Sequence, residues 1–113
     1  MVVYSLVKFE ALNPRSLMVM EGSESAPKFD PGRLVATPGA LASIDQLDII
    51  SALSRHVRGD WGDLCDEDWE TNENALVNEG RLFSVYLSRK KIRFYVITEW
   101  DRSLTTVLLP SEY

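Results

Sequence analysis

Three side chains of types that move protons or hold anions stand out in this 113-residue chain, one at its middle and two near its end: His56, Glu99 and Arg102. A histidine beside a carboxylate can act as a general acid and base, and a guanidinium can hold a phosphate group. If all three converged on one atom, they would form the site of a small metal-independent ribonuclease. No known catalytic motif surrounds them, so this activity stands as the alternative interpretation.

Acidic residues around the middle of the chain favour binding instead of catalysis. Between residues 38 and 80 there are ten acids and two bases, and the whole chain carries a net charge of −5. Such segregation favours a charged macromolecular partner, which we predict to be a protein. The overall negative sign argues against direct binding to a nucleic-acid backbone.

The sequence predicts no metal site and no cofactor. The central acids lack the alternating ligand positions and the middle glycine of a calcium loop. Cys65 is the only cysteine, which excludes an internal disulfide and a thiolate-rich zinc site. We expect Cys65 to be a half-buried apolar residue.

Candidate binding residues lie in two turns, because turns are where a rigid scaffold often presents functional groups. Trp61 has two interpretations: an exposed recognition anchor, or an apolar plug that closes the core under the turn. The second turn also has a structural interpretation, as a turn stabilised by a local ion pair, because Asp and Ser often bond to their own backbone there. The complete set of predicted binding residues is Asp60, Trp61, Asp63, Asp66, Asp101 and Arg102.

Helical spacing of apolar residues predicts one helix over residues 44–58, ended by Gly59, and acids that suit a helix start predict another over residues 66–79. His56 should be a hydrogen-bonded residue at the core boundary. Asn72 should point toward the core, where its amide needs partners, and we expect these to be backbone groups of the turn at residues 60–64.

Alternating patterns predict strands over residues 82–88, 92–99 and 104–109. Residues 1–9 could form an edge strand and residues 33–36 a short strand, while Thr37 followed by Pro38 indicates a helix start. The predicted fold class is α+β, with two main helices packed on one face of a C-terminal three-stranded antiparallel meander that N-terminal strands could extend. The sequence predicts an extension over residues 1–28, in which an edge strand could precede an irregular connector, and a single α+β domain over residues 29–113.

The alternation also assigns faces to the meander. It places Phe83, Val85 and Leu87 on the same side as Phe94. The opposite, polar side mixes aromatic and basic groups, as some single-stranded RNA platforms do, but it lacks the aromatic motif of the common RNA-recognition sheet. That side consists of Ser84, Tyr86, Arg93, Tyr95 and Thr106.

Three segments carry a resemblance to a known family: FDPGRLVATPGALA, RHVRGDWGDLCDEDWETNENAL and ITEWDRSLTTVLLPSEY. Together they resemble small, uncharacterised accessory proteins carried by plasmids, integrative elements and phages, over residues 29–113. Some members are labelled as modification subunits of type I restriction systems. This chain lacks the glycine-rich cofactor loop and the catalytic tetrapeptide of a methyltransferase, so the resemblance supplies context and no catalytic residue.

The leading hypothesis is therefore a small acidic, non-enzymatic binding protein of a mobile genetic element. It would act on a host or element protein, for example one that handles nucleic acid. A third interpretation is a subunit that forms a homodimer through an exposed edge strand. No segment has the composition of a membrane span or an export signal, so the sequence predicts a cytoplasmic protein.

Overall fold

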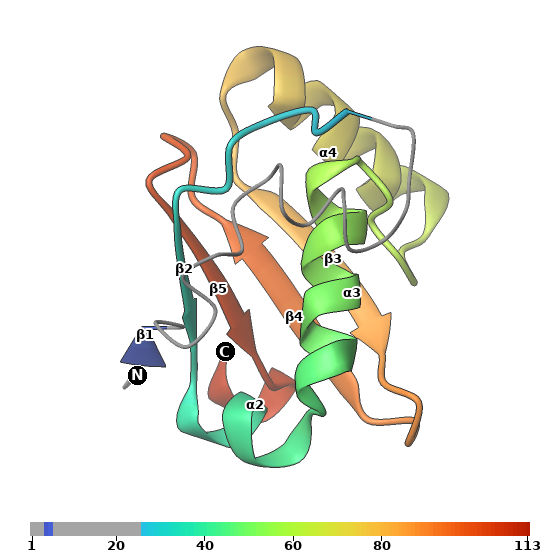
Figure 1. Cartoon of the computed structure of the whole chain (residues 1–113). Helices are drawn as coiled ribbons and strands as arrows, with labels where there is room; N and C mark the ends of the chain where they lie inside the picture. Colours follow the sequence, from blue (N-terminus) through green and yellow to red (C-terminus); the bar gives the residue numbers. More distant parts are fainter. Residues whose placement is uncertain (1–3, 6–25) are drawn as a thin grey trace.

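A mixed β-sheet forms the centre of the molecule (Figure 1). The computed structural model describes residues 4–5 and 26–113. Its main strands are β2 (Arg33–Ala36), β3 (Leu82–Leu87), β4 (Arg93–Thr98) and β5 (Leu104–Leu108), and the two-residue β1 (Tyr4–Ser5) pairs with β2. The sheet order is β1-β2-β5-β4-β3.

The predicted antiparallel meander is confirmed for β3, β4 and β5, but it is only part of the sheet. β2 adds to β5 in parallel, with Arg33 opposite Leu104. A parallel pair needs a long crossover connection, and here the chain between β2 and β5 contains three helices and the other two strands. The alternation within a strand does not reveal which distant strand becomes its neighbour. The predicted strand at residues 1–9 is seen only at β1, and the rest of it lies outside the described residues.

Within the described residues, three α-helices and one short 3₁₀-helix accompany the sheet: α2 (Pro38–Ser43), α3 (Gln46–Val57), α4 (Asp66–Asn78) and η2 (Pro110–Glu112). The predicted helix start before α2 is confirmed, because the Thr37 hydroxyl accepts the N–H of Ala40 at 3.2 Å. α3 is followed by Gly59 at φ +81°, as expected. α4 ends at Glu79 with φ 58°, one residue before the glycine that was expected to end it.

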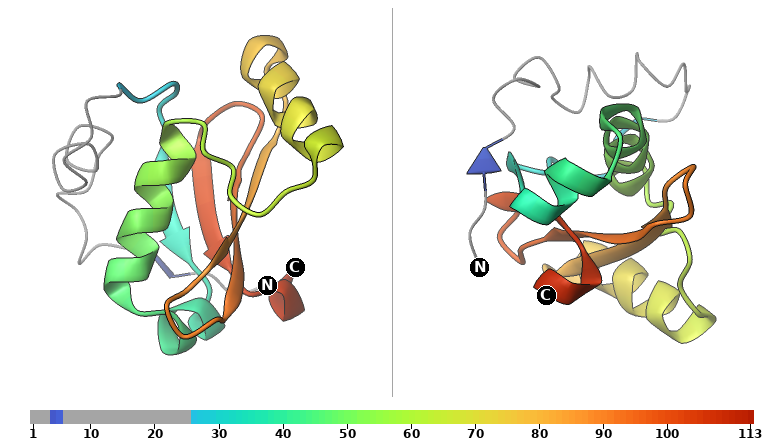
Figure 2. Two further views of the ribbon diagram at one scale, coloured as in Figure 1. Left: turned by 90° about the vertical axis from the view of Figure 1, so that its right-hand side faces the viewer. Right: turned by 90° about the horizontal axis from the view of Figure 1, so that it is seen from below.

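α3 covers one face of the sheet, whereas α4 lies at the edge of the sheet, so the predicted packing of both helices on one face is not found (Figure 2). α3 buries seven residues, and its apolar ones pack against the sheet, including Phe94 and Val96. α4 lies beside the edge strand β3 and buries only Asn72 and Ala75. A helix with so little apolar surface cannot occupy a large area of core. None of the described helices has the length and apolar character needed to cross a membrane.

The faces of β3 are the reverse of those predicted. Ser84 pairs with Val96 and Tyr86 with Phe94, so both point toward α3 and are buried. Phe83 lies on the far face. The strand sequence LFSVYL is apolar at alternate positions on both faces, so its pattern does not choose between them. Ser84 finds a polar partner on the α3 side of the sheet, and this determines which face of β3 points toward α3.

Candidate functional site

That partner is His56, which lies fully inside the protein and not at the core boundary as predicted. Its side chain is 0% exposed. The Nδ1 atom lies 2.5 Å from the Ser84 hydroxyl, and the Nε2 atom lies 2.8 Å from the Thr98 hydroxyl. Both ring nitrogens are therefore occupied by neighbouring hydroxyl groups.

The hydrogen bonds around His56 have a definite direction. The Thr105 hydroxyl donates its only proton to the carbonyl of Pro31 at 2.6 Å, so it accepts from Thr98 at 2.7 Å. Thr98, having given its proton away, accepts from Nε2–H of His56. Nδ1 of His56 then accepts from Ser84. The imidazole is thus the neutral Nε2–H tautomer within a fully satisfied chain of hydrogen bonds.

The charge state of His56 agrees with this chain. Burial lowers the pKa of the imidazole to about 3, and the positive charge of Arg102 acts in the same direction. A second ring proton would have to displace the hydrogen that Ser84 donates. His56 therefore stays neutral at ordinary pH and has no solvent-facing atom with which to exchange a proton with a substrate.

Arg102 acts as a structural clamp between α4 and the turn that joins β4 to β5. Its guanidinium donates to the carbonyl oxygens of Ala75 at 2.9 Å and Gly80 at 2.6 Å, at the end of α4. It also donates to the carbonyls of Glu99 and Trp100, both at 3.1 Å. α4 has no basic residue in its last turn, so Arg102 supplies the missing cation there.

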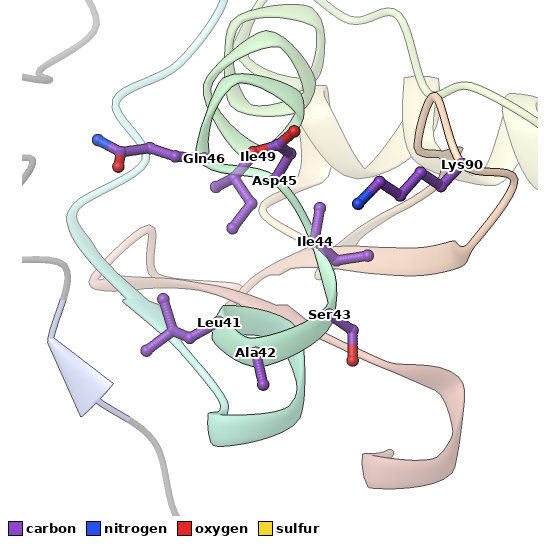
Figure 3. Close-up of a pocket in the computed structure, with 8 residues that line it drawn as sticks. All are labelled: Leu41, Ala42, Ser43, Ile44, Asp45, Gln46, Ile49 and Lys90. Carbon is purple, nitrogen blue, oxygen red and sulfur yellow. The ribbon is translucent and has the colours of Figure 1, made fainter.

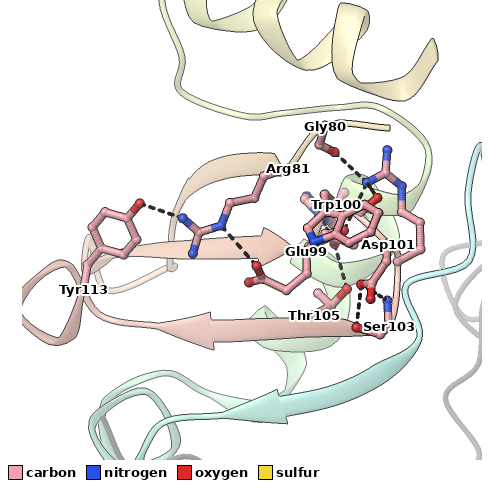
Figure 4. A network of polar contacts seen from close by, with 11 residues as sticks. Gly80, Arg81, Glu99, Trp100, Asp101, Ser103, Thr105 and Tyr113 are labelled. Carbon is pink, nitrogen blue, oxygen red and sulfur yellow. Dashed lines mark hydrogen bonds and ion pairs between the residues drawn. The ribbon is translucent and has the colours of Figure 1, made fainter. Parts of the chain in front are cut away.

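The ribonuclease set does not converge. The Glu99 carboxylate pairs with Arg81 at 3.5 Å, as Figure 4 shows. The ring of Phe29 lies 5.4 Å from the His56 ring and 5.7 Å from the Arg102 guanidinium. His56 is enclosed and Arg102 is occupied by carbonyls, so no common point is open to a phosphate. The geometry gives the ribonuclease interpretation no support.

Trp61 is the buried plug of the two alternatives, with 0% exposure. Its indole N–H donates to Glu73 at 2.7 Å, which fastens the turn to α4. Its carbonyl accepts the N–H of Val85 at 3.1 Å. A Cβ atom on Gly62 would lie 2.0 Å from the carbonyl oxygen of Val85, so only glycine allows the turn to approach β3 this closely. Trp61 is unavailable as a surface anchor.

Asn72 does point inward, but its partner differs from the predicted one. Its amide donates to the Phe83 carbonyl at 2.7 Å and accepts the Phe83 N–H at 3.1 Å. The side chain thus imitates a neighbouring strand, while the turn that contains Trp61 occupies the backbone of Val85. The backbone N–H and C=O groups that Phe83 and Val85 direct away from the sheet are therefore already hydrogen-bonded, so they cannot pair with a strand of a second copy in an edge-to-edge dimer.

Most of the predicted acidic site residues are paired within the molecule. Asp60 bonds to Arg55 at 2.7 Å and Asp63 to Arg93 at 3.1 Å. Partial burial would raise the pKa of Asp60, but the hydrogen bonds and charge of Arg55, with the N–H of Gly62, hold it below its usual value. Asp101 accepts the N–H and hydroxyl of Ser103 within its own turn, as expected. The expected local ion pair is not found among the described residues, because Glu99 pairs with Arg81 and Arg102 donates to carbonyl oxygens.

The start of α4 is different, because its carboxylates have no such partners. No ion pair or hydrogen bond to these side chains is found among the described residues. Asp66 was among the predicted binding residues, but its neighbours were missed. The sequence did contain a signal that these acids lack a nearby cation, because residues 59–80 contain no lysine or arginine. Cys65, just before them, is exposed and not half-buried as expected. The acids concerned are Asp66, Glu67, Asp68 and Glu70.

A hollow with a volume of about 270 Å³ lies elsewhere, between the end of α2 and the start of α3 (Figure 3). Its lining includes Ile44, Asp45 and Lys90. Asp45 is paired with Arg89 at 3.1 Å, and the Ser43 side chain, which also lines the hollow, points away from Lys90 in Figure 3. In the described part of the chain, no three His, Cys, Asp or Glu side chains gather in a way that could hold a metal ion.

Comparison of the chain with protein-family models, with curated proteins and with solved structures finds no match. The proposed function consequently rests on the contacts and charges described above.

Proposed function

We propose that this protein is a small non-enzymatic binding protein that presents the acidic start of α4 to a basic surface of a protein partner. The observation that carries the proposal is a contrast in pairing. Asp48, Asp60, Asp63 and Glu99 are each neutralised by an arginine of the same chain. The four acids at the start of α4 are exposed and have no cation within the described residues.

The shape of α4 suits docking. Asp66, Glu70 and Val77 are separated by four and seven residues, which places all three along one side of a helix. Val77 is 80% exposed, the largest value among the exposed bulky apolar residues of the described chain. An apolar side chain in line with unpaired acids resembles the composition of a protein interface, in which an apolar centre has a charged rim.

A basic partner is favoured by charge complementarity. Unpaired carboxylates attract a lysine- or arginine-rich surface, which raises the association rate and excludes acidic competitors. Proteins that handle nucleic acid have such surfaces. The resemblance to accessory proteins of mobile elements is the reason for seeking this partner among host or element proteins.

The proposal is tested by quantitative capture with the tagged full-length chain from cells that contain its element. We compare wild type with Asp66→Asn/Asp68→Asn and with Asp45→Asn/Asp48→Asn, which removes the same charge from acids that already have a cation. The α4 variant should recover at least tenfold less of a stoichiometric basic partner, and the control should recover a wild-type amount. Equal recovery by both variants, or no partner at physiological salt, would contradict the proposal.

A further inference from the structure

A second surface, on the side of the sheet away from α3, combines exposed rings with arginine. We call it the aromatic face. Phe83 of β3 and Tyr95 of β4 lie on that side, with ring centroids 4.7 Å apart. Neither is fully buried. The face consists of Arg81, Phe83, Tyr95 and Tyr113, and the turn that contains Trp100 lies at its end (Figure 4).

Tyr113 is held on this face by the C-terminal segment. The Glu112 carboxylate accepts the Thr37 hydroxyl and the N–H groups of Gly39 and Leu109, both at 3.0 Å, and so fixes η2. The ring of Tyr113 then packs 6.0 Å from Phe83 and 5.9 Å from Tyr95. Even with these contacts, Tyr113 remains 66% exposed. Its ring is therefore both positioned and accessible.

Trp100 is the second accessible ring, with 61% exposure. It lies in the turn after β4, where Arg102 donates to its carbonyl and where the bonds of Asp101 to Ser103 fix the chain. Figure 4 shows Arg81 between Tyr113 and the turn that contains Trp100. The Arg81 guanidinium donates to the Tyr113 hydroxyl at 3.2 Å and lies 5.7 Å from the centre of its ring.

We propose that the aromatic face binds a short stretch of single-stranded nucleic acid, with bases stacked on Tyr113 and Trp100 and a phosphate near Arg81. Every base has a flat π surface, so aromatic platforms on sheets bind single strands with little sequence preference. Strand alternation places Arg33, Arg81 and Arg93 on the same side of the sheet. Two of these arginines already have a carboxylate partner, because Arg81 pairs with Glu99 at 3.5 Å and Arg93 with Asp63 at 3.1 Å. With a net charge of −5 as well, most of the affinity must come from stacking on the rings and not from attraction to the phosphates.

The acidic start of α4 does not prevent this. Arg102 joins the turn of Trp100 to the opposite end of α4, at Ala75 and Gly80. At about 1.5 Å per residue, the first residues of α4 lie roughly 15–18 Å along the helix from that end. This exceeds the Debye length of about 8 Å at physiological salt, so the repulsion is largely screened. The two surfaces can act independently, and the inference goes beyond the proposed protein partner.

Fluorescence anisotropy with labelled decamers of uridine RNA and thymidine DNA tests the proposal on the full-length chain. Stacking on one ring strengthens binding about five- to 150-fold, so Trp100→Ala and Tyr113→Ala should each weaken binding by at least about fivefold. Leu47→Ala removes an equally exposed apolar side chain from another surface and should leave the affinity unchanged. A duplex decamer, whose bases are already stacked, should bind more weakly than either single strand.

The proposal is overturned if neither single strand binds, if the ring variants bind as tightly as wild type, or if the duplex binds as well as the single strands. Loss of the captured protein partner in Trp100→Ala, without any binding of decamers, would instead make this face a protein interface. Asp66→Asn/Asp68→Asn separates the two proposals, because it should abolish partner capture while keeping the affinity for the decamers.

Discussion

Polar side chains are enclosed and hydrogen-bonded around His56, whereas at the start of α4 they are exposed. Around His56, four side chains are fully or almost fully enclosed, and their hydrogen bonds form one directed chain that ends on the Pro31 carbonyl. At the start of α4, four carboxylates face solvent without a cation from the described residues. The difference separates groups that stabilise the fold from groups that remain available to a partner.

Residue type alone does not make this distinction. A histidine is the commonest proton carrier near neutral pH, yet enclosure removes that role from His56. Asparagine and tryptophan likewise serve the fold here, since Asn72 bonds to the β3 edge and Trp61 fills the core. The availability of a polar group depends on whether neighbouring atoms already satisfy it, and this is a property of packing.

The largest expected effect comes from opening the enclosed region. His56→Ala leaves a cavity and a buried Ser84 hydroxyl without an acceptor, so we expect the free energy of unfolding to fall by about 3 kcal/mol or more. His56→Gln keeps an acceptor and a donor on one side chain and should lose clearly less. Denaturant titration of the three proteins measures this. A loss under 1 kcal/mol in His56→Ala would show that the chain of hydrogen bonds is not a main support of the fold.

Much of the fold could be predicted from local sequence patterns. The predictions were most accurate where a single residue type determines where a helix begins or ends. Helical spacing predicted α3 to within two residues at its start and one at its end, and Gly59 marked the chain reversal after it. The N-cap at Thr37 was predicted because its hydroxyl serves a backbone group only three residues away. Such contacts are short-range, so the sequence itself contains both partners at a fixed spacing.

The site was less predictable because its partners are distant in the chain. Asn72 was expected to bond to the nearby turn, but β3 passes closer and offers two free backbone groups at Phe83. The inward face of β3 depends on His56, 28 residues before Ser84. The parallel addition of β2 to β5 depends on residues about 70 positions apart. Periodicity within a segment contains no information on these encounters.

A smaller effect is expected from pH, and it should involve the enclosed region. The pKa of His56 is lowered to about 3, whereas an unfolded chain binds the proton below about 6.5. The unfolded state therefore holds more protons between these values, and stability decreases as pH falls through this window. From pH 6.5 to 5 the loss should be about 1.5 kcal/mol. The shifted carboxyl groups, including those of Asp60 and Glu112, have pKa values lowered below this range and should contribute little there.

The control for this pH effect is His56→Gln, which has no proton to gain. Its free energy of unfolding, measured by urea titration at the same pH values, should be nearly constant between pH 6.5 and 5. If the free energy of unfolding of His56→Gln fell with pH as steeply as that of wild type, the pH dependence would belong to other groups. This result would contradict the low pKa of the buried imidazole.

The smallest effect on stability is expected at the open region, with Asp66→Asn/Asp68→Asn. Acids in the first turn of a helix interact favourably with its dipole, by about 0.3–1 kcal/mol each. Their mutual repulsion with Glu67 and Glu70 offsets much of this gain, so the free energy of unfolding should change by less than about 1 kcal/mol. Thermal unfolding of the variant and of wild type measures the change in stability. Salt screens both the dipole attraction and the repulsion among the acids, so the change should be smaller at physiological salt than at low salt. A loss above 2 kcal/mol would show that these carboxylates support the fold, and their lack of cations would then no longer indicate a docking surface.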